Sequence, residues 1–215
     1  MTRKCRHAVV LLVIALPAAC SRHRADQATP SDPLAGIGVG QIPAGSLAGA
    51  TVLLYPVGGI VFGDSLAGLA VRRASLLDRA TAVADSTIRA DGRGITWQGA
   101  SEIRAIMRRS PAVAIADPAS VPTAFLLASR VEVVPDPLWS SLRALAALSG
   151  ARMALIPAAV RLDGGEGAVR ASYVFALVDA RLGQMVWRGR VTGPAAATPE
   201  AALVSAAAQA VPSIR

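Results

Sequence analysis

The sequence predicts an α/β (α+β) fold with a single mixed sheet that ends in a C-terminal antiparallel meander, is packed by helices and follows a flexible N-terminal tether. Residues 51–57 form a short, almost wholly apolar run, which is typical of a strand buried on both faces. Residues 65–90 place apolar side chains mostly three or four positions apart, which indicates a helix. Residues 168–178 and 184–191 alternate between apolar and polar side chains, which predicts two antiparallel strands.

The first twenty residues have the layout of an export signal. A basic start with Arg3, Lys4 and Arg6 precedes the uncharged apolar run 8–16 and a small-residue break. That run is too short for a permanent membrane-spanning helix, which needs about 20 apolar residues. The break ends at Cys20, and the stretch LPAAC resembles a bacterial lipoprotein signal, although Pro17 stands where that family usually has leucine.

This resemblance implies that residues 1–19 are a signal peptide and that Cys20 is the lipid attachment site. In that family the cysteine thiol takes a diacylglyceryl group, the chain is cut before the cysteine, and the new amino terminus is acylated. Two or three acyl chains hold a protein stably on a membrane, whereas one does so only marginally. Ser21 stands where an aspartate would retain the protein in the inner membrane, which implies the periplasmic face of the outer membrane. Cleavage without lipidation and an uncleaved anchor remain alternatives.

The composition of the exported chain limits its chemistry. Cleavage removes Cys5, so no disulfide can form within one molecule, and lipid would consume the thiol of Cys20. It also removes three of the 22 basic residues, which leaves 19 against 14 acidic residues and a formal charge of about +5. The remaining basic residues are all arginines, scattered rather than clustered with aromatic residues. We therefore expect no nucleic-acid binding, and at most an attraction to anionic lipid phosphates.

Residues 20–48 are expected to be the lipidated N-terminus and a flexible linker, and residues 49–215 a single α/β periplasmic domain. The linker contains three prolines and four glycines and shows no helical or strand period. Its apolar residues, among them Ile37 and Val39, leave open that part of it packs on the domain. The remaining length suits one domain with its own core.

Between the first strand and the meander, the sequence predicts a loop, a short strand and three further helices. The glycines of residues 58–64 lack the spacing of a phosphate-binding loop, so a plain turn is expected there. The short strand covers residues 95–97, and Ser101 would cap a helix over residues 101–109. After a proline-containing loop, the other two helices are expected over residues 124–130 and 138–148, and Gly150 would stop the last of them.

The meander is expected to consist of strands over residues 152–162, 168–178 and 184–191, with one buried and one solvent-exposed face. On its middle strand Val169, Tyr173, Phe175 and Leu177 share the buried face, and Arg170 and Ser172 share the other. On its last strand Met185, Trp187 and Val191 alternate with Arg188 and Arg190. An alanine-rich closing helix then starts with Thr198 as its cap.

In their order, these segments resemble a group of bacterial envelope lipoproteins. The stretches that carry the resemblance are TVLLYPV (51–57), SEIRAIMRR (101–109), LAALSGARMALIPAAV (145–160) and VFALVDARLGQMVWRGRV (174–191). The group contains relatives of the curli secretion lipoprotein, the flagellar outer-membrane lipoprotein and the penicillin-binding-protein activator. Its members use one α/β domain for non-enzymatic assembly, support or docking. No stretch matches the pore-forming insertions or the docking site of that group, so the resemblance implies a binding role without naming the partner.

The expected domain lacks the residues of the commonest catalytic and metal sites. The only two histidines, His7 and His23, precede it, and so do both cysteines, which excludes Ser-His and Cys-His nucleophiles and the usual zinc sites. The acids that could form a catalytic pair are Asp64, Glu102, Asp117 and Asp136, and a cap, turn or surface role is the simpler interpretation of each.

Two further residue sets have a structural and a functional interpretation. Asp163 and Glu166 offer too few oxygen ligands, in no recognised spacing, to hold calcium. Trp97, Trp139 and Trp187 are expected in the core or half-buried, with a sugar-stacking surface as the minor alternative. We therefore expect no catalytic residue, no cofactor and no metal site.

These observations predict a non-catalytic, membrane-anchored lipoprotein that serves as a binding or accessory module in an envelope protein assembly. Its expected partners are membrane lipid, through acylated Cys20, and another envelope protein, and homo-oligomers remain open. The alternative is a cell-wall-active glycoside hydrolase that uses a carboxylate pair. The hydrolase requires two acids across a groove, whereas a binding module presents an exposed sheet edge or apolar patch.

Overall fold

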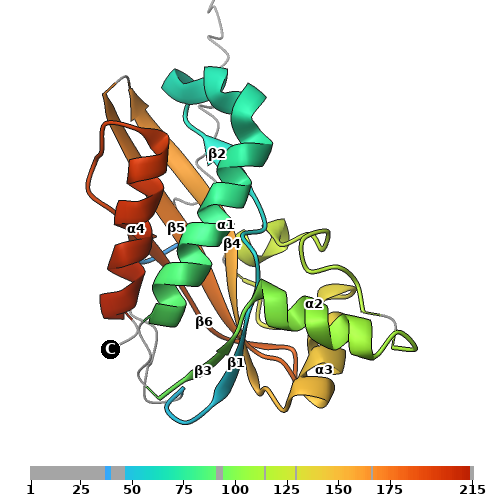
Figure 1. Cartoon of the computed structure of the whole chain (residues 1–215). Helices are drawn as coiled ribbons and strands as arrows, with labels where there is room; N and C mark the ends of the chain where they lie inside the picture. The colour runs from blue at the N-terminus through green and yellow to red at the C-terminus, as the bar shows by residue number, and fades with distance from the viewer. Residues whose placement is uncertain are drawn as a thin grey trace, which may run out of the picture. The chain divides into compact units, whose positions relative to one another are not determined.

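The computed structural model describes residues 37–39, 47–90, 94–113, 115–128, 130–165 and 167–213. Six strands form one mixed sheet in the order β3-β1-β4-β5-β6, and β2 pairs with β4 outside this path (Figure 1). β1 (Thr51–Leu54) is parallel to β3 (Thr96–Gln98) and to β4 (Met153–Gly165). β4, β5 (Ala168–Asp179) and β6 (Gln184–Thr192) are antiparallel to one another. The predicted mixed sheet with a C-terminal antiparallel meander is confirmed.

Two pairs of α-helices cover the sheet in the described part of the chain. α1 (Arg73–Ala90) and α4 (Pro199–Ser213) pack on one face, and α2 (Ala100–Arg109) and α3 (Leu138–Ser149) pack on the other (Figure 1). This division follows from the crossovers, because α1 lies in the connection from β1 to β3, whereas α2 and α3 lie in the connection from β3 back to β4. The helices between parallel strands therefore pack on both faces of the sheet.

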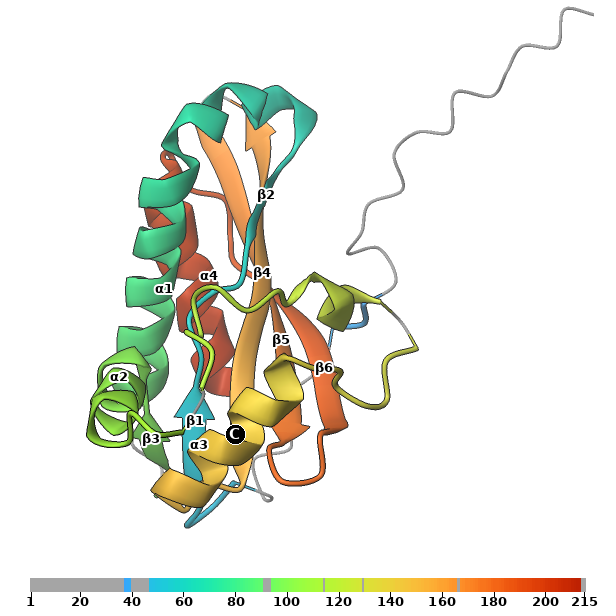
Figure 2. The ribbon, with the colours of Figure 1, turned by 90° about the vertical axis from the view of Figure 1, so that its right-hand side faces the viewer.

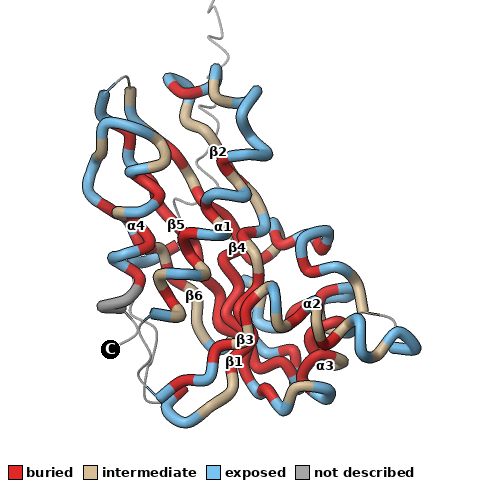
Figure 3. The backbone as a smooth tube through the Cα atoms, viewed as in Figure 1, coloured by how far each residue is buried: buried red, intermediate tan, exposed pale blue. Residues whose placement is uncertain are grey.

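Each face has its own apolar cluster. The cluster under α1 and α4, which we call the first cluster, includes Leu76, Ile88 and Tyr173. The second cluster, under α2 and α3, includes Ile103 and Leu142. Figure 3 shows the buried residues gathered along the central strands between these two helical layers.

The region between β1 and β3 differs from the sequence prediction in two ways. β2 (Ile60–Phe62) lies within the stretch expected to be a plain loop, and it pairs in parallel with the far half of β4, from Val160 to Leu162. The helix expected over residues 65–90 begins as a 3-10 helix, η2 (Asp64–Arg72), and becomes α-helical only at Arg73. Gly68 weakens helix propensity there, and only Leu66 of η2 is buried, so little packing holds an α-helix in that segment.

The helices that follow β3 were predicted closely. α2 starts one residue early, with Gly99 rather than Ser101 as its N-cap, so the predicted cap is wrong by two residues. The predicted short helix is the single 3-10 turn η3 (Ala124–Leu127). α3 buries Leu138, Leu142 and Leu145 as expected and ends at Gly150, which adopts φ +74°.

β5 departs from the expectation that one face of the meander is exposed to solvent. Val169, Tyr173, Phe175 and Leu177 do face the first cluster, but Val174, Ala176 and Val178 are equally buried in the second cluster, under α3. The solvent-exposed face predicted for β5 is therefore restricted to the half near the β4–β5 hairpin.

β6 contains a second departure. The β5–β6 register shifts so that Val178 lies opposite Met185 and Leu177 lies opposite Trp187, which leaves Val186 as an extra residue. Met185 consequently packs against the second cluster and Trp187 against the first, although the two were predicted to share a face.

Residues before position 49 also contribute to the domain. Ile37 is buried in the second cluster, and Leu47 is buried in the first. Arg190 on β6 donates its backbone N–H to the carbonyl of Gly38 at 3.1 Å, next to a parallel bridge between Val39 and Arg190. None of the helices within the described ranges is long and apolar enough to cross a membrane.

Candidate functional site

Cys20, the predicted lipid attachment site, and Glu166, half of the calcium pair that the sequence disfavours, lie outside the described residues. The other half of that pair, Asp163, accepts two hydrogen bonds from Nε of Arg161, at 2.8 and 2.7 Å. In the described part of the chain, no group of three histidine, cysteine or acidic side chains is placed to hold a metal ion.

The four acids singled out from the sequence lie in different places, and three have structural roles. Asp64 is the first residue of η2. Asp117 accepts a hydrogen bond from the N–H of Ala119 at 3.0 Å and closes a turn. Asp136 accepts one from the N–H of Ser140 at 3.1 Å in the first turn of α3. The simpler structural interpretation therefore accounts for these positions.

Glu102 is held between two helices. Its carboxylate receives two hydrogen bonds from Arg89 on α1, at 2.8 and 3.0 Å, and one from the N–H of Gly99 at 3.1 Å. These contacts, with the Arg89 hydrogen bonds as the largest cause, lower the pKa of Glu102 to about 2. A carboxylate with so low a pKa stays ionised at neutral pH and cannot serve as a general acid.

The three tryptophans do not form one platform. Trp97 is 8% exposed and belongs to the first cluster, with Trp187 packed against it. Trp139 is half-buried and packs against the second cluster, on the opposite face of the sheet. A single stacking surface made from these rings is therefore not available.

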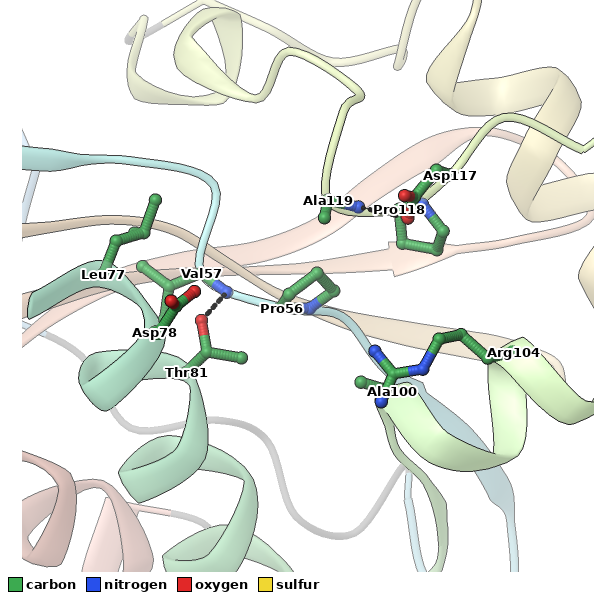
Figure 4. Close-up of a pocket in the computed structure, with 10 residues that line it drawn as sticks. All are labelled: Pro56, Val57, Leu77, Asp78, Thr81, Ala100, Arg104, Asp117, Pro118 and Ala119. Atoms are coloured by element: carbon green, nitrogen blue, oxygen red, sulfur yellow. Dashed lines mark hydrogen bonds between the residues drawn. The ribbon is translucent and has the colours of Figure 1, made fainter. Parts of the chain in front are cut away.

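A hollow of about 160 Å³ lies beyond the carboxyl end of β1 (Figure 4). The neighbouring parallel strands β1 and β3 lead to opposite faces of the sheet, since the connection after β1 packs on one face and the connection after β3 packs on the other. Such a switch point opens a crevice at the carboxyl ends of the strands. Asp78 of α1, Arg104 of α2 and Asp117 line it, so this hollow brings one predicted acid together with a second that the sequence did not single out.

The geometry of this hollow does not make a catalytic pair. Asp78 and Asp117 are both solvent-exposed, and Figure 4 shows Asp117 turned back toward the N–H of Ala119. A general acid in a glycosidase requires a carboxyl group whose pKa is raised by an apolar, water-poor setting. Thr81, which also lines the hollow, uses its hydroxyl to accept the N–H of Val57 at 3.1 Å, so it has a structural contact there.

A different feature surrounds the turn between β5 and β6. Asp179 is 5% exposed, and its Oδ1 accepts the N–H groups of Arg181 and Leu182, each at 3.0 Å, while Oδ2 receives Nε of Arg152 at 3.3 Å. Gly183 follows with φ +70° and donates its N–H to the carbonyl of Asp179 at 2.8 Å. The turn is therefore fixed by one buried carboxylate.

Beside this turn, the edge of β6 is paired with a separate stretch of chain. The N–H of Val134 donates to the carbonyl of Gly183 at 2.7 Å, and the N–H of Met185 donates to the carbonyl of Glu132 at 2.8 Å. This pairing places Val133 next to Gln184. The backbones of residues 132–134 and of the start of β6 are thus held in one fixed arrangement.

Three large apolar side chains are exposed on this rigid frame, and we call them the apolar corner. Val133 is 60% exposed, Leu182 is 59% exposed and Val186, the extra residue of the β6 bulge, is 45% exposed. Sequence reasoning missed them because Val186 lies within a stretch that was expected to alternate regularly, and Leu182 lies within an expected turn. A leucine directly before the turn glycine, where polar residues are usual, was the available signal.

Comparisons with known proteins find likeness at the level of structure. No protein-family model matches the sequence, and no curated protein matches it significantly. The structure is similar to the PelC dodecamer from Paraburkholderia phytofirmans, at 13% identity and a TM-score of 0.40, over 82% of this chain and 92% of that chain. It is similar to the LpoB C-terminal domain from Escherichia coli, at 17% identity and a TM-score of 0.35, over 68% of this chain and 83% of that chain. It is also similar to lipoprotein GNA1162 from Neisseria meningitidis, at 16% identity and a TM-score of 0.33, over 67% of this chain and 80% of that chain. At these identities and TM-scores, none of the three assigns an activity, a partner or an assembly to this chain.

Proposed function

We propose that this protein is a non-catalytic envelope lipoprotein, held by acylated Cys20 on the periplasmic face of the outer membrane, that serves as an accessory module by binding another envelope protein. The observation that carries the proposal is the apolar corner of Val133, Leu182 and Val186. Single exposed apolar residues are ordinary, but three around one turn form a candidate contact surface.

The frame under the apolar corner suits recognition. The carboxylate of Asp179 fixes the turn that carries Leu182, and the pairing of residues 132–134 with β6 fixes the backbone that carries Val133. A surface that is already ordered loses little conformational entropy when a partner binds. The apolar corner therefore presents a preformed contact to a partner protein.

The test is site-specific photocrosslinking of the full chain in native envelopes. A crosslinker at position 182 should join one envelope protein reproducibly, and Val186→Asp in the same chain should abolish that adduct. The matched control is a crosslinker at Val204, an apolar residue of α4 that is 44% exposed, which should not give the adduct. An adduct with a second copy of this chain would instead indicate a homo-oligomer. Equal adducts at both positions, or none at position 182, would refute binding through the apolar corner.

The lipid anchor has a separate test. The mature N-terminal peptide should carry acyl groups on residue 20 in mass spectra and should fractionate with outer membranes. Cys20→Ala should yield an unacylated chain that no longer fractionates with outer membranes. An unmodified Cys20 in the mature wild-type chain would contradict the lipid anchor, but it would leave the proposal that the apolar corner binds a partner unaffected.

The alternative, a carboxylate-pair hydrolase, rests on the shared position of Asp78 and Asp117 at the hollow beyond β1. The exposure of both carboxylates favours the binding role. We expect no release of soluble glycan fragments from purified sacculi by the full chain. Release of glycan fragments by the wild-type chain that is lost in Asp78→Asn and in Asp117→Asn would instead favour the hydrolase.

A further inference from the structure

A second polar surface lies on the meander, away from the apolar corner. Val169, Ala171 and Tyr173 face the first cluster, so Arg170 and Ser172 face the opposite side of β5. Near the β5–β6 turn, α3 covers this side of β5. Toward the β4–β5 hairpin, the same side of the strand lines a pocket of about 430 Å³. Figure 2 shows α1 and α4 together on the other side of these strands.

Two residues with hydroxyl groups line this pocket side by side. Ser172 of β5 lies opposite Thr192 of β6, and their hydroxyl oxygens are hydrogen-bonded to each other at 2.8 Å. Arg170 lies two residues to one side of Ser172, and Arg190 lies two residues to the other side of Thr192. At about 3.3 Å per residue, each arginine starts about 7 Å along the sheet from the hydroxyl pair, which is within reach of its side chain.

The positive charge of the pocket is not balanced by its own acid. Asp163 lines the pocket and lies opposite Arg170 in the strand pairing, but its carboxylate binds Nε of Arg161 on the same strand rather than Arg170. No ion pair within the described ranges joins Arg170 or Arg190 to a carboxylate. Two guanidinium groups therefore remain available to an anion.

Arg190 adds an independent indication. Its Nε atom is buried and finds no hydrogen-bond partner in the described part of the chain. Leaving a buried, charged donor unsatisfied is unfavourable, and a bound ion or water beside it is one of the explanations for such a donor. An acceptor that bound in the pocket and turned the guanidinium group of Arg190 toward itself would remove that penalty.

We propose that this pocket, the arginine pocket of Arg170, Ser172, Arg190 and Thr192, binds a phosphate group. The planar guanidinium group matches phosphate oxygens in a two-pronged hydrogen bond. Of the Ser172–Thr192 hydroxyl pair, the hydroxyl that does not donate to its partner can donate one more. A phosphate ester presents the same oxygens whether it belongs to a lipid headgroup or to a soluble compound. The site is independent of the apolar corner and of any partner bound there.

The first experiment titrates inorganic phosphate into the full chain that carries Cys20→Ala, which has no acyl group of its own. Amide resonances are followed at constant ionic strength set with sodium chloride. Saturable shifts should centre on Ser172, Thr192 and Arg190. Arg170→Gln and Arg190→Gln should each weaken binding about tenfold, the expected loss for one charge-assisted hydrogen-bond partner.

The matched control is Arg108→Gln, which removes one exposed arginine from α2 and lowers the net charge equally. It should leave phosphate binding unchanged. The absence of saturable shifts in a folded chain, or equal weakening by Arg108→Gln, would overturn the proposal. The spectra of the variants also show whether each has kept its fold.

A second experiment separates the two sources of phosphate. If the ligand is a lipid headgroup, vesicles of phosphatidylglycerol in phosphatidylcholine should bind the Cys20→Ala chain. Adding Arg170→Gln should abolish this binding, and adding Arg108→Gln should not. Saturable phosphate binding without vesicle binding supports a soluble phosphate ester in the same pocket. The adduct at position 182 should persist in Arg170→Gln, so failure of the arginine pocket and failure of the proposed function are distinguishable.

Discussion

Arg89 of α1 holds Glu102 of α2 through two hydrogen bonds, from Nη1 to Oε2 at 3.0 Å and from Nη2 to Oε1 at 2.8 Å. The two helices belong to opposite faces of the sheet, so this pair joins the two helical layers around the end of the edge strand β3. The N–H of Gly99, just after β3, donates to the same carboxylate. The pair therefore helps to close the edge of the sheet against unwanted pairing.

The first prediction concerns the pH dependence of this pair. The folded pKa of Glu102, about 2, lies below the value near 4.5 of a free glutamate, so its contribution to stability is fully present above pH 4.5 and is lost as the pH falls toward 2. The side chain is 39% exposed, so solvent screening limits the contribution to about 0.5–1 kcal/mol. Urea unfolding should show that Glu102→Gln destabilises the protein at pH 7 and reduces the loss of stability on acidification.

The control for this prediction is Asp64→Asn, which removes an exposed carboxylate from the first turn of η2. It should leave most of the acid-dependent loss in place. A Glu102→Gln protein whose stability falls between pH 4.5 and pH 2 as steeply as that of the wild type would contradict the role given to the pair.

The second prediction compares two buried tyrosines. Tyr173 donates its hydroxyl to the carbonyl of Ala80 at 3.2 Å, whereas the hydroxyl of Tyr55 is buried without a partner in the described part of the chain. Burial raises the pKa of both phenols, so both are neutral across the accessible pH range. Tyr173→Phe should cost about 1 kcal/mol in urea unfolding, while Tyr55→Phe should be neutral or stabilising, because it removes an unsatisfied polar group. Equal losses from the two substitutions would count against this difference.

Periodicity in the sequence predicted the elements that pack through regular faces. Leu138, Leu142 and Leu145 lie one helical turn apart, and the structure buries all three. The long alternation of β5 likewise placed Tyr173 and Phe175 on one face correctly. These patterns are reliable because each repeats the period of its own element several times.

The errors arose where long-range pairing overrides the local pattern. β2 has only three residues, too few for alternation, and it exists because β4 extends far enough to pair with Ile60. The bulge at Val186 separates Met185 from Trp187, and nothing in an alternating sequence marks it. The arginine pocket and the apolar corner were missed for the same reason, since strand register and tertiary pairing create both.

The third prediction concerns Gly183 in the β5–β6 turn. Its φ is +70°, and a β-carbon built there would lie 2.7 Å from the ring of Trp139. Gly183→Ala should therefore cost the strain of a left-handed alanine and a clash with a packed ring, together about 2–4 kcal/mol. Gly167 has φ +75° with no atom near its missing β-carbon, so Gly167→Ala should cost only about 1 kcal/mol. Urea unfolding of the two variants checks the difference, and equal costs would exclude the Trp139 contact as its cause.

The fourth prediction tests the close packing of Gly58 against Thr123. A β-carbon at Gly58 would lie 1.8 Å from the hydroxyl oxygen of Thr123, which is buried and donates to the carbonyl of Ala158 at 2.8 Å. Gly58→Ala should destabilise the protein by about 1–3 kcal/mol through overpacking, whereas Gly59→Ala, with open space around it, should change little. Thr123→Ala alone should cost about 1–2 kcal/mol, because it leaves the Ala158 carbonyl unpaired.

A variant that carries both Gly58→Ala and Thr123→Ala distinguishes a steric clash between the two positions from two independent losses of stability. Thr123→Ala removes the oxygen at 1.8 Å and leaves only Cβ, at 2.8 Å, near the new methyl group, so the double variant should be more stable than the sum of the two single losses predicts. A double-mutant cycle in urea measures this difference, which we expect to be about 1 kcal/mol or more. Additive losses would mean that the backbone at Gly58 moves away from Thr123 and that the hydroxyl does not restrict position 58 to glycine.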